Sequence, residues 1–249
     1  MFSFLRSYLF TAPLICLSTI FFGAIGILVS FFESDGRRQI GVARIWSRFL
    51  LWAAGVRVRI EGLEHIDRHA SYVFASNHLS YMDTPVVLAY IPVQFRFLAK
   101  KGLFQIPFLG THLARAGHIP VPRDNPRAAV KTLALAAETV RRLGVSLLVF
   151  PEGGRSEDGG LQSFKEGAAY IAIKAGVPVV PICLIGTREV LAFGSGHFHP
   201  GPVRLRIGRP IPTRDLRLGD RNSLTEKIRI EIAGALGEQT VETPSLRKT

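Results

Sequence analysis

The pattern of apolar and polar positions changes sharply along the chain. From Ser7 to Phe32 no residue is charged, and most are Leu, Ile, Phe, Val or Ala. About 20 apolar residues in a row suffice for a helix that crosses the hydrocarbon core of a bilayer. The first segment is therefore predicted to enter a membrane. A cleaved signal peptide is the competing interpretation, but its apolar region would be only about 7–15 residues long.

The shape of this first region is open from the sequence. Pro13, Gly23 and Gly26 lie inside the apolar run, so a tilted single helix and a shallow helical hairpin with the next segment both fit it. The next segment carries arginines among large apolar residues, at Arg37, Arg38, Arg44 and Arg48. This mixture is typical of an interfacial helix on anionic headgroups, and equally of an amphipathic helix packed on a domain. By the positive-inside rule, the remainder of the chain is predicted to face the cytoplasm of a cell membrane.

Segments with strand and helix patterns alternate from residue 55 onward. Short runs of alternating or continuous apolar residues predict strands at 56–60, 71–75, 94–98, 146–150, 177–185 and 203–207. Prolines inside 177–185 suggest an edge position or strand ends for that part. Asn125 with Pro126 and Gly144 delimit a helix over 126–143, and a second helix is predicted over 164–175. Ser223 and Glu226 predict a capping box at the start of the last helix.

Such alternation predicts an α/β fold, with a mixed, largely parallel sheet flanked by helices. The 249 residues suffice for one domain of ordinary size and an extra element. We expect an N-terminal membrane-associated segment at 1–54, a catalytic domain at 55–237 and a frayed tail at 238–249.

Composition narrows the possible partners. The net charge of +12 indicates anionic partners, which include nucleic acid, acidic membrane surfaces and phosphorylated substrates. The basic residues are spread over the whole chain, without zinc-finger spacing or an RNP-like aromatic motif, so no nucleic-acid partner is expected. Cys16 and Cys183 both lie in apolar runs, which excludes a disulfide framework and a CxxC redox or metal site.

A histidine and an aspartate follow the second predicted strand. His78 and Asp83 lie five positions apart, just where a helix should begin. A neutral imidazole can accept the proton of an alcohol, and a carboxylate on its other nitrogen fixes the tautomer and stabilises the imidazolium. On a regular helix the two side chains would diverge, so the pair requires a turn at His78 and a helix start near Asp83. The plain alternative is a helix cap beside a loop histidine.

Two further segments have the composition of anion sites. Residues 150–156 follow another predicted strand and combine glycines, which let the backbone approach a ligand, with the guanidinium of Arg155. Arg123 precedes the N-terminus of the helix predicted over 126–143, where free N–H groups favour anions. Taken singly, each segment also fits a turn with a solvated arginine.

Together with the proline-bearing block at 177–182, these segments resemble the glycerolipid acyltransferases, most closely the 1-acyl-glycerol-3-phosphate (lysophosphatidic acid) acyltransferases. The resemblance runs from about Asn77 to Ile182. It implies His78 as general base and Asp83 as its orienting partner, within the family's NHx4D motif. It also implies an arginine, Arg123, that contacts the acceptor's phosphate.

The family's third block usually reads Phe-Pro-Glu-Gly-Thr-Arg-Ser. It is matched here, with the substrate-binding roles that the resemblance implies, by Glu152, Gly153, Arg155 and Ser156. Gly154 stands where threonine is usual, so no hydroxyl contact is expected from that position. Lys100 resembles the family's lysine upstream of the second block and is also assigned to substrate binding.

The resemblance implies transfer of a fatty acyl group from acyl-CoA or acyl-carrier protein to the sn-2 hydroxyl of lysophosphatidic acid, which gives phosphatidic acid. Membrane lipids and an anionic lysophospholipid are the expected partners; no cofactor and no metal are expected, and the oligomeric state is left open. One alternative is another acceptor, such as a lyso-ornithine lipid. A second is a non-catalytic basic lipid-binding protein. A metal hydrolase built on His197 and His199 lacks a convincing third ligand.

Overall fold

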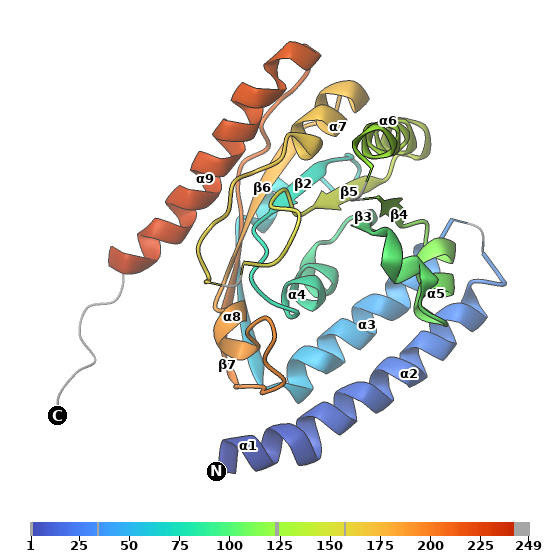
Figure 1. Cartoon of the computed structure of the whole chain (residues 1–249), viewed down its shortest axis with the longest axis vertical. Helices are drawn as coiled ribbons and strands as arrows, with labels where there is room; N and C mark the ends of the chain where they lie inside the picture. Colours follow the sequence, from blue (N-terminus) through green and yellow to red (C-terminus); the bar gives the residue numbers. More distant parts are fainter. Residues whose placement is uncertain (1, 34, 123–124, 157, 242–249) are drawn as a thin grey trace.

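The sheet has the strand order β1-β7-β6-β2-β5-β3-β4 in the computed structural model, which describes residues 2–33, 35–122, 125–156 and 158–241 (Figure 1). The strands are β1 (Val56–Glu61), β2 (Val73–Ser76), β3 (Phe95–Lys100), β4 (Ile119–Val121), β5 (Ser146–Val149), β6 (Val179–Ile185) and β7 (Gly201–Ile207). Neighbouring strands are parallel, except that β6 and β7 pair antiparallel. The predicted mixed, largely parallel sheet is confirmed.

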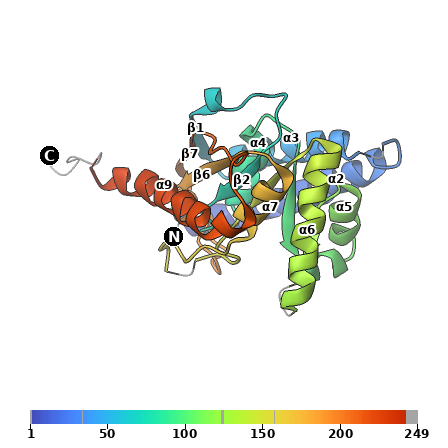
Figure 2. The ribbon, with the colours of Figure 1, turned by 90° about the horizontal axis from the view of Figure 1, so that it is seen from above.

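Helices cover both faces of this sheet (Figures 1 and 2). The alternation of side chains along β2 shows how, because Phe74 belongs to one buried cluster whereas Val73 and Ala75 belong to the other. The first cluster includes α3 (Arg37–Ala53) and α4 (Asp83–Tyr90). The second cluster includes α6 (Pro126–Leu143), α7 (Gly167–Ala175) and α9 (Arg221–Val241). A sheet buried on both faces explains the near-continuous apolar runs of its central strands.

Local signals set the ends of α6 as predicted. The Asn125 side chain accepts a hydrogen bond from the N–H of Ala128 at 3.0 Å, and Gly144 ends the helix in the left-handed region with φ +61°.

Two other helix starts were predicted wrongly. Helix α7 begins at Gly167 rather than at residue 164, because the N–H of Lys165 is bound by the carbonyl of Pro151. Helix α9 begins at Arg221, two residues before the predicted cap, and the Ser223 hydroxyl instead donates to the carbonyl of Asp220. Helix α9 is described through Val241, and the remainder of the predicted tail lies outside the described residues.

Of the two placements predicted for the prolines, the edge position is wrong, because β6 lies between β7 and β2 and is buried throughout. Pro178 does lie at a strand end, just before Val179, but Pro181 lies inside β6. Pro181 is tolerated there for a local reason. Its carbonyl accepts the N–H of Gly208, the residue after the end of β7. In a strand, the backbone N and C=O of one residue point to the same side. The missing N–H of Pro181 therefore faces Gly208, one residue past the end of β7, where the regular pairing of the two strands stops.

The apolar run forms one continuous helical rod. It consists of α1 (Phe2–Arg6), a π-helical turn η1 (Ser7–Thr11) and α2 (Ala12–Val29), with helical dihedrals at every junction. From Phe4 to Val29 it has the length and apolar composition of a membrane-crossing helix, and it is largely unburied. Thus Pro13 lies in the first turn of α2, where proline is tolerated, and the glycines do not break the rod.

Helix α3 folds back along α2, so the two form a helical hairpin (Figure 1). The indole N–H of Trp46 donates to the hydroxyl of Thr19 at 3.2 Å across this pair. On its other side α3 belongs to the core of the domain. Arg44 donates to the carbonyls of Ile91 and Val93, just after the end of α4, where the helix dipole favours a cation. This face of α3 is therefore that of an amphipathic helix packed on the domain.

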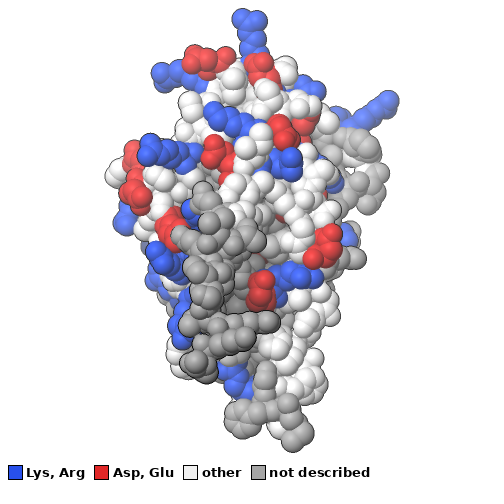
Figure 3. All heavy atoms as spheres, turned by 90° about the vertical axis from the view of Figure 1, so that its left-hand side faces the viewer, with Lys and Arg blue, Asp and Glu red and all other residues white. Residues whose placement is uncertain are grey.

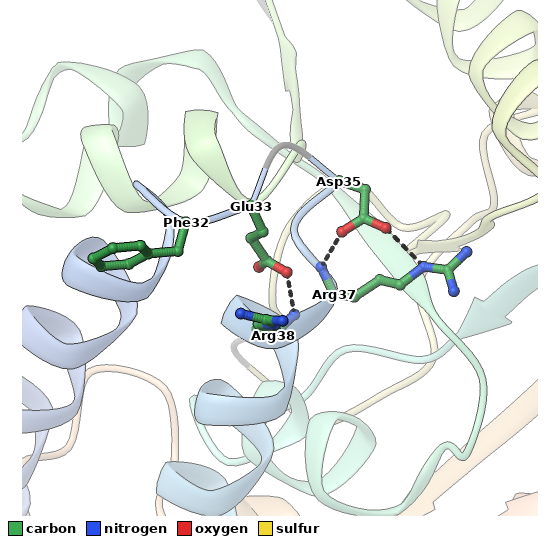
Figure 4. A pocket seen from close by; sticks show the side chains of 5 residues that line it. All are labelled: Phe32, Glu33, Asp35, Arg37 and Arg38. Carbon is green, nitrogen blue, oxygen red and sulfur yellow. Dashed lines mark hydrogen bonds and ion pairs between the residues drawn. The ribbon is translucent and has the colours of Figure 1, made fainter.

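The turn between α2 and α3 contains a hollow of about 420 Å³. It is lined by Phe32, Glu33, Asp35, Arg37 and Arg38 (Figure 4). The Glu33 carboxylate accepts the N–H groups of Arg38 and Gln39 and so caps α3. Arg96, near the start of β3, donates to the carbonyl of Asp35, so this turn lies by the amino ends of the sheet's parallel strands. The candidate catalytic residues follow the opposite, carboxyl ends.

Surface charge is mixed rather than concentrated on the face that contains α9. Blue and red side chains intermingle over the upper part of the visible face (Figure 3). The net positive charge is thus not gathered into one patch on this side.

Candidate active site

The residues singled out in the sequence follow the carboxyl ends of neighbouring parallel strands. The turn that contains His78 follows β2, residues 150–156 follow β5, and Lys100 ends β3. Since β2, β5 and β3 are adjacent and parallel, these segments meet at the carboxyl ends of the strands, where open α/β sheets bind ligands. Arg123, the predicted phosphate contact, lies outside the described residues.

The histidine and the aspartate form a buried pair. Nδ1 of His78 lies 2.8 Å from Oδ2 of Asp83, whose side chain is fully buried. The same oxygen accepts the N–H groups of Leu79 at 2.7 Å and Ser80 at 2.8 Å. Helix α4 starts at Asp83, as the predicted pairing requires. The carboxylate therefore orients both the imidazole and the turn that carries it.

Contact with a carboxylate also determines the tautomer of His78. A carboxylate can only accept hydrogen bonds, so Nδ1 carries the hydrogen and Nε2 is the basic nitrogen. The imidazole stacks on the ring of Phe150, with centroids 3.8 Å apart and an interplanar angle of 14°. This ring was missed as a positioning group, although it begins the family block. It restricts rotation of the imidazole and keeps one of its faces away from water.

Glu152 holds the backbone of the site together. Its Oε1 accepts the N–H of His78 at 2.7 Å, and its Oε2 accepts the N–H of Gln162 at 3.0 Å. Burial raises the pKa of Glu152 above its ordinary value, and these two N–H groups oppose the shift. The carboxylate thus joins the His78 turn to the loop before α7. Its predicted contact with substrate stays a prediction.

Ser156 closes the loop after β5 and is almost fully buried. Its N–H donates to the carbonyl of His78 at 3.0 Å, and its hydroxyl donates to Asp158 at 2.7 Å. The hydroxyl bond lowers the pKa of Asp158. Ser156 therefore fixes the relation between the two loops, and its predicted substrate contact is untested.

The two glycines of the loop differ in their surroundings. Gly153 has φ +76°, a left-handed backbone conformation that a residue with a Cβ adopts only with strain. An added Cβ would also lie 2.8 Å from Nζ of Lys165, the mobile end of a side chain. Gly154 has no atom within 4 Å of an added Cβ. A Cβ at this position therefore enters open space. Lys165, which the sequence analysis missed, adds a positive charge beside Gly153.

Arg155 points its guanidinium toward the histidine turn. Its Nε donates to the carbonyl of Ser80 at 3.1 Å. Its guanidinium carbon lies 4.3 Å from the ring centroid of Tyr81, which is one of the four residues between His78 and Asp83. The predicted phosphate-binding arginine thus contacts the turn that joins His78 to Asp83.

No group of three or more possible metal-binding side chains occurs in the part of the chain that the structure describes. The imidazoles of His197 and His199 do lie together, with ring centroids 4.0 Å apart. The imidazole of His197 also contacts the rings of Phe4 in α1 and Tyr8 in η1. This pair is accordingly part of the packing against the N-terminal helix.

Comparison with known proteins agrees with this fold and these segments. The crystal structure of the 1-acyl-sn-glycerophosphate (LPA) acyltransferase PlsC from Thermotoga maritima superposes with a TM-score of 0.79 and 26% identity. The match covers 98% of this chain and 97% of that one. Residues 57–185 match the family model described as Acyltransferase, and the chain belongs to that acyltransferase family.

Relatives in other organisms bear related names. A chloroplastic 1-acyl-sn-glycerol-3-phosphate acyltransferase of Arabidopsis thaliana is 38% identical over 172 residues, which are 68% of this chain and 48% of that protein. The 1-acyl-sn-glycerol-3-phosphate acyltransferase alpha of Homo sapiens is 27% identical over 210 residues, which are 84% of this chain and 74% of that protein. The chain thus spans about half the length of the Arabidopsis relative.

Proposed function

We propose that this protein transfers a fatty acyl group from an acyl thioester, acyl-CoA or acyl-carrier protein, to the sn-2 hydroxyl of lysophosphatidic acid. The observation that carries the proposal is the buried His78–Asp83 pair on the same turn that Arg155 contacts. Membership of the acyltransferase family and the names of the relatives support the reaction class and the acceptor.

The proposed reaction is a direct transfer. Nε2 of His78 takes the proton of the acceptor hydroxyl while that oxygen forms a bond to the thioester carbonyl carbon. Asp83 stabilises the resulting imidazolium through Nδ1. The C–S bond of the tetrahedral intermediate then breaks, and the imidazolium returns the proton to the leaving thiolate. No cofactor takes part in this scheme.

Arg155 and Arg123 are assigned to the acceptor's phosphate, because a guanidinium can bind a phosphate through two parallel hydrogen bonds. Lys100, at the end of β3, and Lys165, beside Gly153, add positive charge near these residues. Holding the acceptor in place converts a bimolecular attack into an effectively intramolecular one. The apolar rod from Phe4 to Val29 is proposed to hold the protein at the cell membrane, with the catalytic domain on the cytoplasmic side.

Release of free thiol from acyl-CoA by the purified protein, with and without lysophosphatidic acid, tests the reaction. We expect release to depend on the acceptor and on His78, so that His78→Ala at equal abundance loses about 10²–10⁴-fold in kcat. Near wild-type turnover by this variant would remove the proposal. A panel of acceptors including a lyso-ornithine lipid tests the acceptor, acyl-carrier protein tests the donor, and phospholipase A2 cleavage of the product tests the sn-2 position.

A further inference from the structure

Two aromatic rings from distant parts of the chain accompany the guanidinium of Arg155. Its guanidinium carbon lies 4.3 Å from the ring centroid of Tyr81 and 5.8 Å from that of Phe193. The two rings are themselves 5.5 Å apart. We call Tyr81 and Phe193 the aromatic pair. Both rings are about two-fifths exposed, at 44% and 40%, so burial in the core does not account for their position.

Phe193 is held in place by the backbone of its own loop. That loop follows α8 (Thr187–Val190) and leads to β7. The Ser80 hydroxyl donates to the carbonyl of Leu191 at 2.5 Å, and Ser80 forms an isolated β-bridge with Ala192. Further along the loop, the N–H of Phe198 donates to the hydroxyl of Ser7 at 2.8 Å. The loop that carries the ring is thus bonded to the histidine turn before Phe193 and to the N-terminal helical rod after it.

We propose that the aromatic pair positions Arg155 for the anionic headgroup of the acceptor, an inference that rests on the proposed function. Arginine has a long side chain with many rotamers, and ordering it on binding costs free energy. The bond from Nε to Ser80 fixes one corner of the guanidinium. Attraction to the aromatic rings and their bulk restrict the remaining freedom and keep water away. Tyr81 and Phe193 are therefore positioning residues that act through Arg155.

Removal of either ring should weaken acceptor binding selectively. We expect Phe193→Leu and Tyr81→Leu to raise the KM for lysophosphatidic acid by about three- to tenfold, as the strength of a cation–π contact indicates. The KM for the acyl donor and kcat should change by less than about twofold. Phe193→Tyr and Tyr81→Phe keep a ring in place and should retain the wild-type KM.

A double-mutant cycle separates this role from a direct contact of Phe193 with the substrate. In an Arg155→Ala background, Phe193→Leu should raise the acceptor KM no further, because the group that it positions is absent. Phe31→Leu is the matched control, since Phe31 lies under the guanidinium of Arg115 at 4.2 Å, away from the site. It should leave the acceptor KM unchanged.

The outcomes separate this inference from the proposed function. If the wild-type protein acylates lysophosphatidic acid and the leucine variants keep its KM, only the role of the aromatic pair is overturned. An equal loss from Phe193→Leu with and without Arg155 would also overturn it. If the wild-type protein does not acylate lysophosphatidic acid, the proposed function fails. The role of the aromatic pair is then tested by the affinity of His78→Ala protein for radiolabelled lysophosphatidic acid, with and without Phe193→Leu. Equal affinities would show that the pair does not position Arg155 for this headgroup.

Discussion

The side-chain amide of Asn77 exchanges two hydrogen bonds with the backbone of Leu184. Nδ2 donates to the carbonyl at 2.9 Å, and Oδ1 accepts the N–H at 2.7 Å. Backbone pairing of β2 with β6 ends at Ser76 and Ile182, one residue before Asn77 and two before Leu184, so the amide extends the ladder past the end of the strand. The residue before His78 is thereby fixed to the centre of the sheet.

Asn77→Asp should therefore harm both stability and catalysis. The carboxylate keeps the size of the amide and can accept the N–H of Leu184, but it places a second acceptor against the Leu184 carbonyl. A buried acceptor without a donor costs about 1–3 kcal/mol in the free energy of unfolding, and more when it is charged. Denaturation followed by circular dichroism in detergent, with kcat at a temperature where both proteins are folded, measures the two effects. Wild-type stability would show that these bonds contribute little.

The two neighbouring glycines of the third block should respond in opposite ways to substitution. Gly153→Ala forces a Cβ into the left-handed region and against Lys165, so we expect loss of activity and of stability. Gly154→Thr enters open space and should retain wild-type stability and a kcat within about twofold of it, since surface changes free of steric conflict are usually small. Thermal unfolding and thiol release from both variants test the contrast. A Gly154→Thr protein as damaged as Gly153→Ala would contradict it.

The two arginines assigned to the phosphate should affect one substrate more than the other. We expect Arg155→Ala and Arg123→Ala each to raise the apparent KM for lysophosphatidic acid by about tenfold or more, because a charge-assisted hydrogen bond contributes about 1.5–3 kcal/mol. The KM for acyl-CoA should change much less. Arg229→Ala on α9, whose arginine pairs with Glu226, is a control that should alter neither constant. Equal increases for both substrates would refute the phosphate assignment.

The sheet and the histidine–aspartate pairing could be predicted because local patterns dictate them. Buried strands alternate with amphipathic helices, and the side chains of His78 and Asp83 can meet only across a turn that ends at a helix start. The edge position predicted for 177–185 failed for a tertiary reason. Whether Pro181 disrupts a sheet depends on where the neighbouring β7 ends, and no pattern within 177–185 contains that information.

Contacts between distant residues were also hidden from the sequence. Phe150 stacks on His78 from the next parallel strand, and Phe193 reaches Arg155 from a loop more than 35 positions downstream. Glu152 carries no sign in the sequence that its carboxylate binds two backbone N–H groups rather than a side chain. Segments with functional chemistry are visible in the sequence, whereas the groups that orient them become visible only in three dimensions.

The buried imidazole of His118 predicts a pH dependence of stability that is independent of catalysis. His118 follows α5 (Leu109–Arg115), where its backbone N–H donates to the carbonyl of Leu113, and its Nδ1 accepts the N–H of Phe97 in β3 at 3.0 Å. Burial, with smaller contributions from the charges of Arg96 and His112, lowers the pKa of His118 to about 3. The folded protein therefore keeps this ring neutral at pH values where the unfolded chain, with a pKa near 6.5, binds a proton.

Because the unfolded state binds more protons in this range, stability should be full above about pH 6.5 and fall as the pH drops toward 3. Between pH 7 and pH 5 this one group should remove about 2 kcal/mol from the free energy of unfolding. His118→Asn can still accept the N–H of Phe97 but does not titrate, so the difference between the two pH values should shrink by that amount. Urea unfolding in detergent at both pH values measures it, and replacement of the exposed His69 by Asn serves as the control. A His118→Asn profile as steep as that of the wild type would mean that His118 is protonated in the folded protein, or that other groups, such as His112, control its acid sensitivity.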